Sequence, residues 1–470
     1  MEQQKITADR SKPFGWSDKI GYALGDAGNN FTFTMISSFF MIFLTNILGI
    51  SPAIVAMLLL LARLIDAIAD ITVGRLVDVS KLKNGSRFIP WITRFKWPLA
   101  IFAVLLFIPY VNTLPMAARV AYVSVMYLGW GIIYSCVNIP YGSLSAAMSD
   151  DSHEKSTLST WRTLGATAAS MSLNFALPVL AYSVGPNGTK VLNETNFLFV
   201  VVGCVILSLV SYKLTTVMTT ERIHVEREKA LPLSELLKHM AGNRALIALV
   251  VLDLVLTLNQ NLNGVNMTYL FTYYFGSVGA LATILLLQSL LTFAVAPFSS
   301  WLTNTFGRKE TTVVALIEAT LFFWILVVLH THSIAIFMTL NILANVGVVI
   351  FNINIWAFIN DVIDNQQVIT GIREVGSIYA VNSLSRKIAQ AIAGSFGAGM
   401  FAVIGFVAST SGGAQQSTST INGIYVLATM IPAVTTFVAV FVTAFWYPLN
   451  KKKVLENIKT LEENIETVEG

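Results

Sequence analysis

The stretch AIVAMLLLLARLIDAIADITVGRLV, residues 53–77, decides what kind of fold this chain adopts. A run of about 20 apolar residues is long enough to cross the hydrocarbon core of a bilayer as a helix. Arg63, Asp66 and Asp70 interrupt the run. Charge at that depth is costly unless it faces a cavity or a partner. The stretch therefore predicts a membrane span with one functional face.

Outward from this stretch, apolar runs of similar length recur along the whole chain. They predict an all-α membrane protein with twelve transmembrane helices in two six-helix bundles. The predicted bundles are residues 1–215 and 245–446, joined by a central cytoplasmic loop at 216–244 and followed by a cytoplasmic tail at 447–470. The predicted spans are 18–46, 53–77, 91–111, 118–147, 159–183, 196–215, 245–273, 278–302, 312–331, 333–359, 377–408 and 421–446.

The composition fits a chain whose main solvent is lipid. Of the 470 residues, 55% are hydrophobic and 12% are charged, whereas soluble domains carry about a quarter charged residues. A net charge of +4 is too small and too dispersed to predict nucleic-acid binding. No nucleotide-binding P-loop is found, so we expect neither ATP drive nor a cofactor. Cys136 and Cys204 lie in apolar runs and are expected to be buried thiols.

The distribution of Lys and Arg indicates how the spans are oriented. The loops after spans 2, 4, 6 and 8 are basic, whereas the loops after spans 1, 7 and 11 contain no Lys or Arg. We therefore predict a multi-pass protein of the cytoplasmic (inner) membrane with both termini in the cytoplasm.

The charged residues of span 2 form the first candidate site. Arg63, Asp66 and Asp70 are three and four residues apart, so they share one face of the helix. Two carboxylates one turn apart can bind a small cation or share a proton. Two acids beside one arginine leave negative charge, which favours a cation-coupling role for Asp66 and Asp70. The alternative is a static ion-pair network that holds two helices together.

Polar groups on three further spans form the second candidate site. Amide, hydroxyl and basic groups that converge beside aromatic rings suit a sugar, which offers hydroxyls and apolar ring faces. Any single amide is equally well explained as a hydrogen bond between helices. In the second half, Asp253 and Glu318 also lie within predicted spans. The sequence does not indicate which of them is functional and which is structural. The groups on spans 1, 4 and 11 are Asp26, Asn30, Ser135, Asn138, Gly142, Arg386 and Lys387.

Four motifs carry a resemblance to a known family. They are GYALGDAGNNF at 21–31, RLIDAIAD at 63–70, VNIPYGSL at 137–144, and a long match from DVID at 361–364 through TGIR at 370–373 to RKIAQ at 386–390. With these motifs in order, residues 15–450 resemble the glycoside–pentoside–hexuronide:cation symporter family of the major facilitator fold. Within that family the chain looks most like bacterial glucuronide permeases and less like melibiose permease.

The resemblance implies roles for individual residues. It implies a carrier that alternates its access and couples sugar transport to H⁺, Na⁺ or Li⁺. The implied cation site is Asp66 and Asp70 with Ser135 nearby. The loop with Asp361, Asp364 and Arg373 resembles the family's cytoplasmic gating segment. The implied sugar site is Asn30, Asn138, Gly142, Arg162 and Lys387, to which the shared face of span 1 adds Asp26.

Departures from the family pattern suggest the ion and the sugar. Ala69 stands where the family can place an amide ligand, and sodium needs several oxygen ligands, so H⁺ is favoured over Na⁺ at Asp66 and Asp70. Asn30 and Asn138 stand where melibiose permease has carboxylates, while Arg162 remains. This favours an anionic hexuronide over a neutral pentoside or hexoside. The alternative is that the basic residues pair with the acids and never touch the substrate.

Two other functions stay open on the sequence alone. In one, the chain is an uncoupled sugar facilitator or exchanger, and Asp66 and Asp70 are structural. In the other, it is a sugar sensor that keeps the transporter fold without turnover. The expected partners are therefore a sugar or glycoside, a coupling cation and the lipid bilayer.

Overall fold

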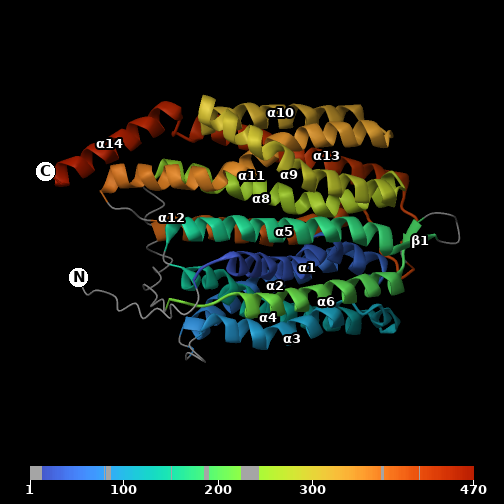
Figure 1. The fold of residues 1–470 in the computed structure, drawn as a ribbon. Helices are drawn as coiled ribbons and strands as arrows, with labels where there is room; N and C mark the ends of the chain where they lie inside the picture. Colours follow the sequence, from blue (N-terminus) through green and yellow to red (C-terminus); the bar gives the residue numbers. More distant parts are fainter. Residues whose placement is uncertain are drawn as a thin grey trace. The chain divides into compact units, whose positions relative to one another are not determined.

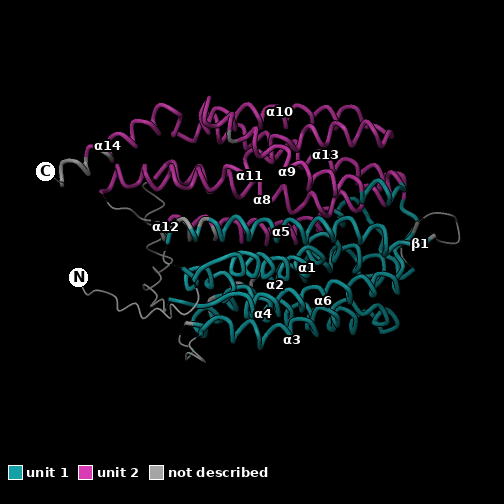
Figure 2. The backbone as a smooth tube through the Cα atoms, viewed as in Figure 1, with its two compact units in different colours: residues 1–228, 276–282, 401–416 teal, residues 229–275, 283–400, 417–470 magenta. Residues whose placement is uncertain are grey.

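The computed structural model describes residues 13–78, 80, 86–149, 151–184, 190–223, 243–371, 375–411 and 413–469. It is almost entirely helical (Figure 1). Two compact units are formed by the described parts of Met1–Glu228, Gly276–Ala282 and Phe401–Gln416, and of Lys229–Phe275, Thr283–Met400 and Ser417–Gly470 (Figure 2). The domain boundaries predicted from the sequence stay a prediction.

The first unit is built around α1, which packs against α5 and α6, while α4 packs against α2 and α3. A two-stranded antiparallel sheet joins α5 to α6. The elements are α1 (Trp16–Asn46), α2 (Pro52–Asp78), α3 (Phe88–Leu106), the 3₁₀ turn η1 (Pro109–Thr113), α4 (Met116–Met148), α5 (Ser152–Leu180), β1 (Tyr182–Val184), β2 (Lys190–Leu192) and α6 (Glu194–Met218).

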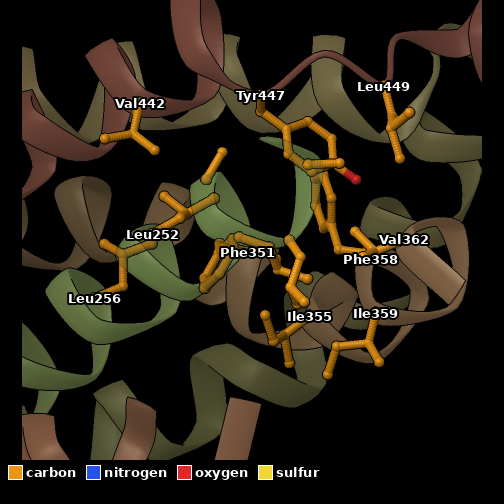
Figure 3. Close-up of a cluster of buried hydrophobic side chains, with 14 of the residues drawn as sticks. Leu252, Leu256, Phe351, Ile355, Phe358, Ile359, Val362, Val442, Tyr447 and Leu449 are labelled. Atoms are coloured by element: carbon orange, nitrogen blue, oxygen red, sulfur yellow. The ribbon is translucent and has the colours of Figure 1, made fainter. Parts of the chain in front are cut away.

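The second unit is built around α10, which packs against α11 and α13, and α8 packs against α13. Figure 3 shows the apolar cluster in which Leu252 and Leu256 of α8 meet Phe351 and Ile355 of α11. The elements are α8 (Arg244–Tyr269), the π-helical turn η2 (Leu270–Tyr274), α9 (Val278–Phe306), α10 (Arg308–Leu329), α11 (Ile334–Thr370), α12 (Val375–Val403), α13 (Thr418–Phe441), the π-helical turn η3 (Val442–Trp446) and α14 (Lys451–Glu469).

Among the described residues, ten helices are long and apolar enough to cross a membrane. Helices α2 and α12 are of similar length, at 27 and 29 residues. Helix α2 carries Arg63, Asp66 and Asp70, and α12 carries Arg386 and Lys387. The helical bounds follow the predicted spans closely at most ends.

The largest difference from the predicted bounds lies at the end of span 10. The sequence predicted that span 10 ends at 359 and that Asp361 and Asp364 lie in a loop, but α11 continues to Thr370. The helix begins where Ser333 accepts a hydrogen bond from the backbone N–H of Ile336, and it ends at Gly371 with φ +75°. Only glycine takes that left-handed conformation without strain. Polar residues thus extend this helix beyond its apolar part.

Candidate functional site

Ser135 of α4 bridges to the acidic face of α2. Its hydroxyl donates a hydrogen bond of 2.5 Å to Oδ1 of Asp70. One turn earlier, a guanidinium nitrogen of Arg63 lies 3.7 Å from Oδ2 of Asp66. The three residues that the sequence assigned to cation coupling therefore lie together, with Arg63 at their edge.

Close approach of the two helices holds this cluster in place. Gly131 of α4 lies directly against the Asp66 carboxylate, and a Cβ built there would meet its Oδ1 and come within 3.3 Å of its Cγ. A side chain at this position would push the carboxylate away from α4. Among the described residues, no group of three or more His, Cys, Asp or Glu side chains could hold a metal ion.

The second candidate site centres on an ion pair between α1 and α5. Nε of Arg162 lies 3.3 Å from Oδ1 of Asp26. The amide of Asn30 donates to the backbone carbonyl of Asp26 at 2.9 Å. One turn from Arg162, Gly165 lies so close to the carbonyl of Ala23 that a Cβ would collide with it. This contact brings the two helices near enough for Arg162 to reach Asp26, which is the alternative that the sequence left open.

Arg162 also lies over an aromatic ring. Its guanidinium carbon is 5.4 Å from the ring centroid of Tyr141, a cation–π distance. Tyr141 in turn stacks on Tyr22 at 4.8 Å and donates to the backbone carbonyl of Tyr22 at 2.7 Å. Both tyrosines lie in motifs at 21–31 and 137–144 that carry the family resemblance, but the sequence gives no signal for their stacking, because residues on separate spans meet only in the fold.

Arg162 remains 41% exposed while the Asp26 side chain is 10% exposed. Within the described part of the chain, only Nε of Arg162 takes part in a hydrogen bond. Its two terminal nitrogens therefore present an edge that can take a second acceptor. Asn138 is half-buried, and a Cβ at Gly142 would meet no atom within 4 Å. A side chain at position 142 of α4 would thus meet open space.

The remaining predicted residues lie in the second unit. Lys387 is exposed on α12. Asp361 is buried and forms an ion pair with Arg308 at the start of α10. Asp364 follows one turn later on α11. Arg373, the third predicted gating residue, lies outside the described residues.

Comparison with known proteins places the chain in a family. A family model described as MFS/sugar transport protein matches residues 21–451. The chain belongs to that family. The resemblance to glycoside–pentoside–hexuronide symporters is thereby confirmed, and the protein is a multi-pass membrane transporter with the major facilitator fold.

Individual relatives agree over nearly the whole chain. The chain is 29% identical to a glucuronide carrier protein homologue of Escherichia coli K12, covering 96% of each chain. It is 27% identical to an isoprimeverose transporter of Lactiplantibacillus pentosus, covering 89% of this chain and 86% of the relative. Among solved structures, a D-xylose–proton symporter matches with a TM-score of 0.62 at 13% identity, covering 92% of this chain and 98% of the other. That last likeness shows the fold alone.

Proposed function

We propose that this transporter is a secondary active symporter that carries a sugar glycoside together with a proton. The observation that carries the proposal is the cluster of Asp66, Asp70 and Ser135 between α2 and α4. Two carboxylates on one face of a membrane helix are costly to retain unless a cation visits them. The hydrogen bond from the Ser135 hydroxyl would hold the Asp70 carboxylate in position while the cation binds and leaves.

A proton is the coupling ion that this cluster fits better. Sodium requires several oxygen ligands arranged around it, whereas a proton needs one carboxylate. Ala69 contributes no side-chain oxygen between the two acids. The Ser135 hydroxyl already donates a hydrogen bond to Asp70, so only the lone pairs of its oxygen remain to bind a sodium ion.

Uptake into vesicles under imposed gradients tests the coupling. We expect accumulation above equilibrium when an inward proton gradient is imposed, and none from a sodium gradient at fixed pH. Equilibration without accumulation would support a facilitator or exchanger, and binding without flux would support a sensor. Stimulation by sodium with indifference to the proton gradient would reverse the choice of ion.

We propose an anionic hexuronide such as a glucuronide as the substrate. The support is the edge of Arg162 that makes no hydrogen bond within the described part of the chain, and, on α4, the open space at Gly142. A guanidinium can hold a carboxylate through two parallel hydrogen bonds, which no neutral sugar accepts. Asp26, Asn30 and Asn138 would bind the sugar hydroxyls, and Lys387 would add positive charge.

The substrate proposal is tested by competition between matched ligands. We expect a β-glucuronide to bind at least tenfold more tightly than the corresponding β-glucoside, since a charged hydrogen bond contributes about 1.5–3 kcal/mol. Equal affinity would return Arg162 to a structural role as the partner of Asp26.

Two further assignments belong to the same proposal. Asp361, Asp364 and Arg373 would hold one conformation closed on the cytoplasmic side, with Arg308 as the partner of Asp361. We also propose that both termini lie in the cytoplasm and that the protein resides in the inner membrane, which the basic loops support. Labelling of single cysteines in the loops from each side of the membrane would test this orientation.

A further inference from the structure

The second unit contains a buried acid for which neither the coupling cluster nor the sugar site accounts. Asp253 of α8 is 2% exposed. The hydroxyl of Thr257 donates to its Oδ1 at 3.3 Å. Its other oxygen, Oδ2, has no hydrogen-bond partner among the described residues. An unsatisfied carboxylate oxygen in a low-dielectric interior is costly, and a bound proton removes most of that cost.

One basic residue stands beside this acid. Arg386 of α12 acts electrostatically on Asp253, and the amide of Asn382 lies next to it. A hydrogen bond of 2.9 Å from Ser385 to the carbonyl of Val250 fixes α12 against α8 at this level. In the described structure, however, Arg386 and Asp253 do not form an ion pair. The guanidinium is therefore near the carboxylate without closing on it.

Among the described residues, the apolar cluster packed against α8 contributes no charge beside Asp253. Leu252 and Leu256, which flank Asp253 on α8, are surrounded by Phe351 of α11 and Val442 of η3 in the apolar cluster of Figure 3. Burial acts most strongly on the protonation of Asp253, and among the described groups Arg386 is the charged residue that opposes it. Thr257 and Asn382 act on the same carboxyl as neutral hydrogen-bonding neighbours.

The same pairing occurs, in a closed form, in the first unit. Asp26 lies 10 residues after the start of α1 at 16, and Asp253 lies 9 residues after the start of α8 at 244. Their basic partners, Arg162 and Arg386, lie 10 and 11 residues after the starts of α5 at 152 and α12 at 375. Each acid is on the first helix of its bundle and each arginine on the fifth. One unit shows the pair in contact, and the other shows it apart.

We propose that Asp253 is a second proton-binding residue of the transporter and that Arg386 controls its proton. A proton taken from water binds Asp253 while Arg386 is withdrawn. When Arg386 closes on the carboxylate, the proton returns to water and the charge of the guanidinium is neutralised. The proposal rests on proton-coupled transport, because it links proton release to the availability of Arg386 for an anionic sugar.

Infrared spectroscopy of the purified full-length protein tests the proton directly, without any substrate. A protonated carboxyl has a C=O stretch distinct from that of a carboxylate. We expect the wild-type protein near neutral pH to show a carboxylic-acid band that Asp253→Asn lacks and that Asp66→Asn retains. Asp253→Glu, which keeps a carboxyl, should restore such a band. An unchanged spectrum for a folded Asp253→Asn protein would overturn the proposal.

Arg386→Gln provides the second test and remains informative if Asp253→Asn does not fold. Without the guanidinium, the band should persist to a pH higher by about one unit or more, the effect of one nearby opposite charge. Disappearance of the band at the wild-type pH would also overturn the proposal. Both infrared measurements are made without sugar. A failure of glucuronide transport in vesicles would therefore count against the proposed function and would not affect the infrared evidence for a proton on Asp253.

Discussion

Gly131 offers the sharpest perturbation of the proposed coupling cluster. In Gly131→Ala the added methyl group would meet the Asp66 carboxylate, whose Cγ lies 3.3 Å from the built Cβ. The atoms it meets are the end of a side chain, so the carboxylate shifts while the helices stay in place, at a cost of about 0.5–1.5 kcal/mol for a side chain driven off its rotamer. If that cost falls on the arrangement that binds the cation, its affinity falls by about 2- to 13-fold, at 1.4 kcal/mol for each factor of ten. We expect proton-driven accumulation to weaken accordingly while downhill exchange of the sugar continues.

Gly203→Ala is the matched control. Gly203 lies within α6, and a Cβ there would meet no atom within 4 Å. Both substitutions gain the same helix propensity, about 1 kcal/mol, so the difference between the two variants reports the contact with Asp66. The assay is uptake into proteoliposomes over a series of imposed proton gradients, with sugar counterflow measured in parallel. Wild-type accumulation by Gly131→Ala at every gradient would refute the assignment of Asp66 to coupling.

Three further outcomes follow from the same geometry. The double variant Asp66→Asn, Asp70→Asn should lose uphill accumulation and keep some counterflow; full accumulation would contradict the coupling role. Arg162→Gln should abolish the preference for a β-glucuronide over its β-glucoside in a competition assay, and a preference that survives would place the substrate carboxylate elsewhere. Arg308→Gln should leave the buried Asp361 carboxylate without its part-exposed partner and cost about 1–3 kcal/mol of stability. Thermal unfolding measures that loss, and an unchanged melting temperature would show that the pair contributes nothing to stability.

The sequence was sufficient to predict most of the helices and the charged face of α2. Spacing alone put Arg63, Asp66 and Asp70 on one side of α2, because a helix has a fixed period. The residue that faces this side of α2 could not be predicted from spacing, since Ser135 is assigned there only by the family resemblance. The contact is set by Gly131, a residue whose importance depends on what another helix presents to it.

The errors and omissions have the same origin. Asp361 and Asp364 were assigned to a loop because the segment around them is polar, but α11 extends past its apolar part and ends only at Gly371. The closure of Arg162 on Asp26 was foreseen only as an alternative. Choosing between substrate and acid as the partner of Arg162 required knowing how near α5 comes to α1.

Close helix contacts thus decide which charges in this protein are satisfied internally. At the α1–α5 contact, Gly165 lies against the backbone of Ala23, and the pair one turn away is closed at 3.3 Å. At the α8–α12 contact, the helices meet through the side chain of Ser385, and the corresponding acid keeps an unsatisfied oxygen. The proposed symport of a proton with an anionic sugar requires at least one buried acid whose partner can change. We propose Asp253 of the second unit for that role, whereas the closed pair of the first unit leaves the edge of Arg162 for the proposed substrate.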